Sequence, residues 1–99
     1  MTAVELITAD QVRDATWQTL QHVPFEQGGW GRLQESVEFP ELQLKTWRTT
    51  RRDPVRGAFL VRGHALAVHH LPEGDFRFPE DVYALAAAML TACRSERAA

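Results

Sequence analysis

The sequence predicts a small α+β protein, a four-stranded antiparallel sheet (a meander) flanked by an N-terminal and a C-terminal helix in the order α-β-β-β-β-α. Apolar residues recur at helical spacing near both ends and alternate through the middle of the chain, and turn residues separate the alternating runs. The length of 99 residues is that of one domain. We therefore expect a single globular domain over residues 1–99, with frayed ends at 1–5 and 95–99.

The first helix is expected over residues 8 to 22. Thr8 is a suitable N-cap, and Asp10 in the first turn complements the positive end of the helix dipole. The Val23-Pro24 junction ends the helix, because the residue before a proline disfavours the helical region. Residues 24–31, PFEQGGWG, are then expected to form a loop, since proline and three glycines favour irregular backbone.

Four strands follow in the middle of the chain. The first is expected over 32–39, where apolar and polar residues alternate, and the second over 42–51, LQLKTWRTTR. The third (58–61, AFLV) and the fourth (65–71, ALAVHHL) are joined by the two-residue turn Arg62-Gly63.

The register of this last hairpin follows from its short turn. Val61 should face His64, and Leu60 should face Ala65. Both faces of the hairpin are then mostly apolar, so we expect it to be central in the sheet.

The second helix is expected from residue 79 to about residue 94. Pro79 suits the first helical position, and Glu80 and Asp81 complement the helix dipole. A wide apolar face follows, made of Val82, Leu85, Ala86, Met89, Leu90 and Cys93. This order of elements resembles that of secretion-chaperone-like folds, which also end in a hairpin followed by an amphipathic helix.

The charge of the chain is unevenly distributed. Residues 42 to 62 carry six bases and one acid, a local charge of +5. Since the net charge of the chain is −2, the other 78 residues together carry −7. Such a charge distribution steers an anionic partner or pairs with the acidic end of a second copy.

The basic stretch gives the candidate binding site. We assign to it Lys45, Trp47, Arg48, Arg51, Arg52 and Arg56. Strand alternation places Lys45, Trp47 and Arg51 on one face, with Arg52 and Arg56 at the turn. An acidic protein partner is the first interpretation. The alternative is nucleic acid, with cations on phosphates and Trp47 stacked on a base.

The histidines give a third candidate site. Alternation places His64 and His70 on one face and His69 on the other, so His64 and His70 could bind a metal ion or a small ligand. Their spacing matches no compact metal motif, and we assign no metal ligand and no cofactor.

No catalytic constellation is visible, so we expect no enzymatic activity. The single cysteine, Cys93, lies on the apolar face of the second helix, where cysteine is usually a small hydrophobe. Residues 28–31, GGWG, lack the glycine spacing and the lysine of a phosphate loop. Without a cysteine pair, a signal peptide or a membrane-length apolar run, the chain is expected to be cytoplasmic and free of membrane.

These expectations combine into a non-enzymatic binding or adaptor module. Two helices on one face of a four-stranded sheet leave the other face open. We expect the protein to be a homodimer that uses this open face for the contact, or to bind an acidic protein partner there.

Overall fold

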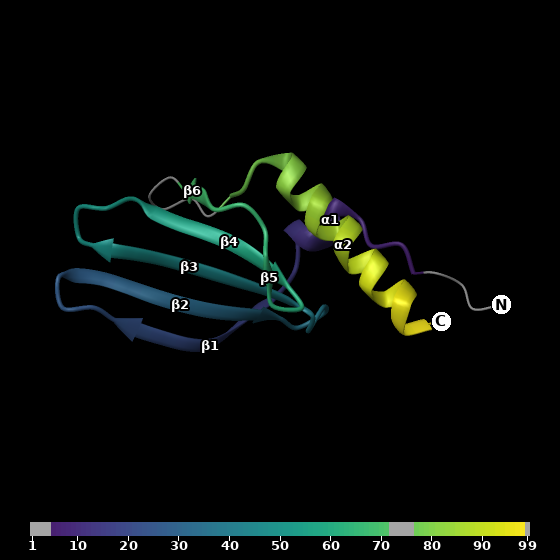
Figure 1. The fold of residues 1–99 in the computed structure, drawn as a ribbon, viewed down its shortest axis with the longest axis horizontal. Coiled ribbons are helices and arrows are strands. Elements are labelled where there is room, and N and C mark those ends of the chain that lie inside the picture. The colour runs from purple at the N-terminus through teal and green to yellow at the C-terminus, as the bar shows by residue number, and fades with distance from the viewer. Residues whose placement is uncertain (1–4, 72–76, 99) are drawn as a thin grey trace.

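The computed structural model describes residues 5–71 and 77–98, and the expected fraying at residues 1–4 and 99 lies outside this range. The sheet is antiparallel throughout, with the order β1-β2-β3-β4-β5 and β6 also paired to β4 (Figure 1). The predicted α+β meander with a helix at each end is therefore confirmed, with six strands where four were expected, because Trp17–Pro24 is a strand and the expected strand 65–71 is divided in two. The elements are α1 (Ala9–Arg13), β1 (Trp17–Pro24), β2 (Gly28–Ser36), β3 (Leu42–Thr50), β4 (Val55–Val61), β5 (His64–Ala65), β6 (His69–Leu71) and α2 (Glu80–Ala98).

The first helix is much shorter than expected. It begins as predicted at Thr8, whose hydroxyl accepts from the Gln11 backbone while the Gln11 side chain accepts from the Thr8 backbone. It ends at Arg13, and from Trp17 the chain is a strand paired with β2, so a helix over 8 to 22 is wrong. The paired segment, WQTLQHVP, is rich in aromatic and β-branched residues, and sheet pairing overrides its weak helical pattern.

The expected loop at 24–31 is also wrong for most of its length. The hairpin turns within Phe25–Gly28, where the Gly28 N–H donates to the Phe25 carbonyl (3.3 Å) and the Phe25 N–H donates to the Gly29 carbonyl (3.0 Å). Gly28 has φ +82°, as the glycine of a three-residue hairpin connection requires. Gly29 is already inside β2, and a Cβ added there would lie 2.1 Å from the Thr49 carbonyl oxygen. Close approach of β2 to β3 therefore explains this glycine.

The hairpin after β4 has the predicted register. Val61 pairs with His64 and Leu60 with Ala65, and the turn residues Arg62 and Gly63 have φ values of 50° and 80°. Both positive values fit the type I′ turn that matches strand twist. The hairpin is not central, because β5 and β6 lie at the edge of the sheet beside β4. The expected fourth strand, 65–71, is interrupted between Ala65 and His69.

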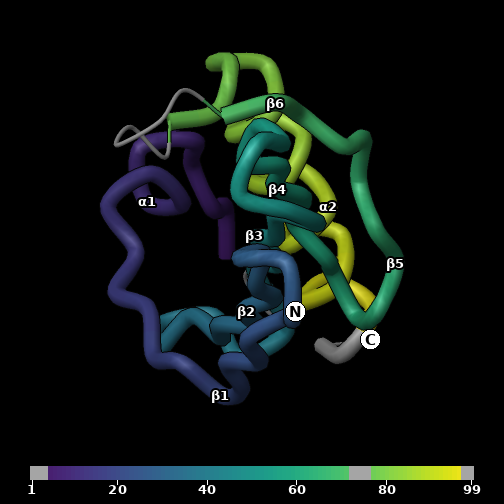
Figure 2. The backbone as a smooth tube through the Cα atoms, turned by 90° about the vertical axis from the view of Figure 1, so that its left-hand side faces the viewer, coloured from purple at the N-terminus to yellow at the C-terminus, as the bar shows by residue number. Residues whose placement is uncertain are grey.

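The core lies between the helices and one side of the sheet. Phe59 of β4 is at its centre, with its ring centroid 4.4 Å from that of Phe78 and 5.8 Å from that of Tyr83 in α2. Both helices gather at one end of the sheet, as Figure 1 shows, and the β1–β2 and β3–β4 hairpins project beyond them. We call this projecting part, including residues 21–33 and 45–57, the arm. Figure 2 views the molecule from the arm, with β1 to β4 in a column. The molecule measures 54 × 24 × 20 Å, and the arm forms one end of its long axis (Figure 1).

Candidate functional site

The two sides of the sheet differ in what covers them. Residues that pair across antiparallel strands project to the same side, and neighbours along a strand alternate. Leu42, Leu44 and Thr46 of β3 are buried and share their side with Phe59, so this is the helix side. The open side presents Gln21, Val23, Gly31, Leu33, Gln43, Lys45, Trp47, Arg56 and Leu60.

An apolar hollow lies on the open side. It encloses about 390 Å³, and Val23, Phe25, Leu33 and Leu60 give most of its apolar lining. The Phe25 ring folds back over Gly31, since a Cβ there would lie 3.4 Å from the Phe25 Cζ. Val23 and Phe25 are 40% and 44% exposed, so this hydrophobic surface is accessible to a partner.

Three of the predicted binding residues lie beside this hollow. Lys45 lines it, and the Lys45 Nζ is 5.7 Å from the ring centroid of Trp47, close enough for a cation–π contact. Trp47 pairs in register with Arg56 of β4. Lys45, Trp47 and Arg56 therefore form one group on the open side.

The other three predicted residues lie elsewhere. Arg48 projects from the helix side of β3, and its Nη2 donates to the Gly28 carbonyl at 3.2 Å. Arg51 and Arg52 follow the end of β3 in a turn. The expectation from alternation that Arg51 shares a strand face with Lys45 and Trp47 is therefore wrong. Asp53 fixes this turn, because its Oδ2 accepts from the Thr50 N–H at 2.9 Å.

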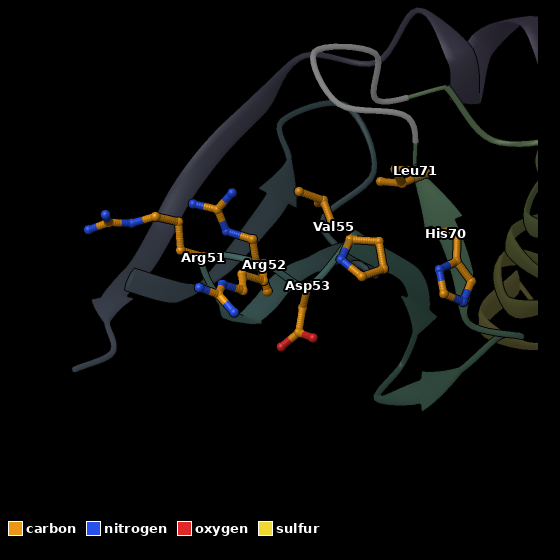
Figure 3. A pocket seen from close by; sticks show the side chains of 8 residues that line it. Arg51, Arg52, Asp53, Val55, His70 and Leu71 are labelled. Atoms are coloured by element: carbon orange, nitrogen blue, oxygen red, sulfur yellow. The ribbon is translucent and has the colours of Figure 1, made fainter. Parts of the chain in front are cut away.

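These three arginines line a second hollow at the tip of the arm, shown in Figure 3. It is open to solvent and encloses about 540 Å³. Arg51 and His70 lie at opposite ends of it, with Arg52 and Asp53 between them (Figure 3). We call it the tip hollow. Its lining is Arg48, Arg51, Arg52, Asp53, Pro54, Val55, His70 and Leu71.

The two ends of the molecule differ in whether their cations form ion pairs. At the helical end, Arg13 contacts Asp10 and Glu80, and the hydrogen bond to Asp10 is the main cause that raises the Arg13 pKa. Arg94 contacts Glu5 and Glu41, and the hydrogen bond to Glu41 raises the Arg94 pKa most. Within the described residues, no ion pair involves any of the six cations of the arm, Arg32, Lys45, Arg48, Arg51, Arg52 and Arg56.

The histidines do not form the predicted pair. His64 pairs with Val61 on the helix side, whereas His70 pairs with Arg56 on the open side. The interruption between β5 and β6 breaks the alternation on which the expected shared face depended. Among residues 5–71 and 77–98, no group of three or more His, Cys, Asp and Glu side chains could hold a metal ion.

Two further expectations concern the cysteine and a membrane-spanning segment. Cys93 is buried in the hydrophobic core on α2, as its position on the apolar face predicted. No helix in the described part of the chain has the length and hydrophobicity to cross a membrane.

Sequence reasoning missed Val23, Phe25 and Leu33 as site residues. The cause is that a helix was expected over residues 8 to 22, so Trp17–Pro24 was not recognised as a strand of the sheet. The Phe25–Gly28 connection between two segments with β-forming residues was the available hairpin signal.

No protein-family model, curated protein or solved structure shows a significant match to this chain.

Proposed function

We propose that this protein is a non-enzymatic binding module that docks the open side of its sheet onto an acidic protein partner. The observation that carries this proposal is the apolar hollow of Val23, Phe25 and Leu33 next to the cations Lys45 and Arg56. Protein interfaces combine an apolar centre with a polar rim, and unpaired cations on that rim steer an acidic partner into place. The single cysteine excludes an internal disulfide, which suits a reducing compartment such as the cytoplasm.

A partner of opposite charge fits the open side better than a second copy does. Face-to-face packing of two open sides would bring the Lys45 and Arg56 of both copies into one interface. Like charges in a desolvated interface are unfavourable, whereas carboxylates from a different protein would neutralise them. We therefore rank the predicted homodimer below an acidic protein as the partner of the open side.

The test is the affinity of a labelled amphipathic peptide that alternates glutamate with leucine and phenylalanine, measured by fluorescence anisotropy. Phe25→Ser removes the apolar contact and should weaken binding about tenfold. Leu85→Ser is the matched control, because Leu85 is an exposed apolar residue on α2 at the other end of the molecule. Equal affinities of the two variants would contradict the proposal. Light scattering on the same proteins detects a dimer, and a dimer that Phe25→Ser dissociates would favour the second copy.

The unpaired cations of the arm favour nucleic acid as a second candidate partner. Labelled random single-stranded and duplex DNA, titrated at low and moderate salt, test it directly. Binding should weaken with salt with a log–log slope of about −0.9 per duplex phosphate neutralised. Arg51→Glu combined with Arg52→Glu should then abolish it, while Phe25→Ser should have little effect. Absence of binding at low salt would remove this candidate.

A further inference from the structure

We infer that the tip hollow is a binding site for a phosphate monoester carried on an apolar group. The site is separate from the open-side hollow and does not depend on the proposed protein partner. Its charges, one buried donor and its apolar lining each point to this ligand class.

The charge of the tip hollow matches a dianion. Arg48, Arg51 and Arg52 line it, and within the described residues none of them has an ion pair. Asp53 is the one acid in the lining, and its Oδ2 already accepts from the Thr50 N–H. The hollow thus carries an excess of two positive charges without counting His70. Guanidinium groups are planar and donate in pairs to phosphate oxygens, which makes arginine the preferred residue for this ligand.

Arg48 supplies a donor that the protein itself does not satisfy. The Arg48 Nε is buried and has no hydrogen-bond acceptor among the described residues, although Nη2 of the same side chain is held by the Gly28 carbonyl. A buried N–H without an acceptor costs free energy. Arg48 lines the hollow, so a small movement of its side chain would bring Nε to an anionic oxygen there and recover this cost.

The opposite part of the lining is apolar. Val55 and the buried Leu71 lie between the arginines and His70 (Figure 3), and Pro54 also lines the hollow. The volume of about 540 Å³ exceeds the needs of an inorganic phosphate and lies in the range of small-molecule sites. A ligand with its phosphate at the arginine end and an apolar group against Pro54 and Val55 would use both parts (Figure 3).

Phenyl phosphate is the probe that matches this description, and phenyl sulfate is its matched control. The two have nearly the same shape, but at pH 7.5 phenyl phosphate is a dianion and phenyl sulfate a monoanion. We expect the arginine Nε–H signals in ¹⁵N–¹H NMR spectra to shift saturably with phenyl phosphate, and the Arg48 signal to shift most. Phenyl sulfate and inorganic phosphate should each bind about tenfold more weakly, because one lacks the second charge and the other the apolar group.

Variants separate a built site from general attraction of anions. Arg51→Ala combined with Arg52→Ala should weaken phenyl phosphate binding by about tenfold or more, and Arg48→Lys should weaken it although the charge remains. Lys45→Ala and Arg62→Ala remove cations outside the hollow and should change the affinity by less than about twofold.

Three results would overturn the site. These are equal affinities for phenyl phosphate and phenyl sulfate, unsaturable shifts of all arginine signals together, and unchanged binding by the Arg51 and Arg52 double variant. Free phosphotyrosine and a phosphotyrosyl peptide then identify the source of the ligand. Equal affinities for free phosphotyrosine and the peptide indicate that the natural ligand is a small molecule. Tighter binding of the peptide indicates that it is a phosphorylated protein. Phe25→Ser should leave phenyl phosphate binding unchanged, so this site and the open-side function can fail independently.

Discussion

The ring of Trp17, the first residue of β1, stacks on the ring of Phe59 in β4, with centroids 6.0 Å apart and planes 24° from parallel. Strands β2 and β3 lie between β1 and β4 in the sheet, so the indole reaches across the helix side toward the core. Phe59 in turn contacts Phe78 and Tyr83. Trp17 therefore ties the outermost strand of the arm to the aromatic centre of the protein.

Trp17→Ala should lower the free energy of unfolding by about 2–4 kcal/mol, because it removes a large, partly buried ring and its stacking on Phe59. Trp47→Ala is the matched control, since Trp47 lies on the open side away from the core. It should cost about 1 kcal/mol or less. Urea unfolding followed by circular dichroism measures both, and equal losses would contradict this role of Trp17.

The elements that were predicted well have strong local signals. The second helix begins with proline and acids and carries a wide apolar face, and the observed α2 is longer than predicted, reaching Ala98. The Arg62-Gly63 turn fixes its register through two positive φ values. Both features depend on neighbours in sequence, so the sequence alone is sufficient to predict them.

The parts that were missed depend on distant contacts. The contacts that place Trp17 in a strand are distant in sequence, because its partner in the sheet is Ser36 and its aromatic partner is Phe59. The open-side hollow contains residues of β1, β2, β3 and β4. Because β1 was not predicted as a strand, the hollow could not be predicted either. The basic residues were identifiable, but where β3 ends decides which side Arg51 occupies.

Gly29→Ala should prevent normal pairing of β2 with β3. An added Cβ would lie 2.1 Å from the Thr49 carbonyl oxygen and 2.2 Å from that of Arg48, so backbone must move. We expect a loss of about 3 kcal/mol or more in the free energy of unfolding, measured by urea titration. Gly63→Ala is the control, with φ +80° and no atom within 4 Å of the added Cβ. Its cost should be limited to about 1–2 kcal/mol of backbone strain.

Thr46→Val should be neutral or stabilise the protein by up to about 1 kcal/mol. The Thr46 hydroxyl is buried on the helix side and has no hydrogen-bond partner among the described residues, so replacing it with a methyl removes an unsatisfied polar group. Ser36→Ala is the comparison, because the equally buried Ser36 Oγ accepts from the Phe39 N–H at 3.0 Å. That variant should lose about 1–2 kcal/mol. A destabilised Thr46→Val protein in thermal unfolding would show that the hydroxyl has a partner.

Arg94→Ala should destabilise the protein by about 1–3 kcal/mol. Its guanidinium contacts the carboxylate of Glu41, whose side chain is 6% exposed, and lies over the Phe39 ring at 5.1 Å from the centroid. Removing the cation takes a charged partner from a buried carboxylate. Arg62→Ala breaks the exposed pair with Glu96 and should cost less than about 0.5 kcal/mol. Both values come from urea titrations at low salt, and equal losses would contradict the difference in burial.

Glu38 should make stability depend on pH. The Thr16 N–H donates to both carboxylate oxygens of Glu38, at 2.8 and 3.2 Å, and this hydrogen bond is the main cause that lowers the Glu38 pKa below that of a free glutamate. A carboxyl with a lowered folded pKa contributes stability that is complete above its unfolded pKa and is lost as pH falls through the folded pKa. Glu38→Gln should therefore be less stable than the parent protein at pH 7, and the difference should shrink as pH falls below about 4.3. Urea titrations between pH 7 and pH 3 measure it, with Glu26→Gln at the exposed β1–β2 turn as a control expected within about 0.5 kcal/mol of the parent. A difference that stays constant over this range would show that the Glu38 charge does not stabilise the junction between α1 and β1.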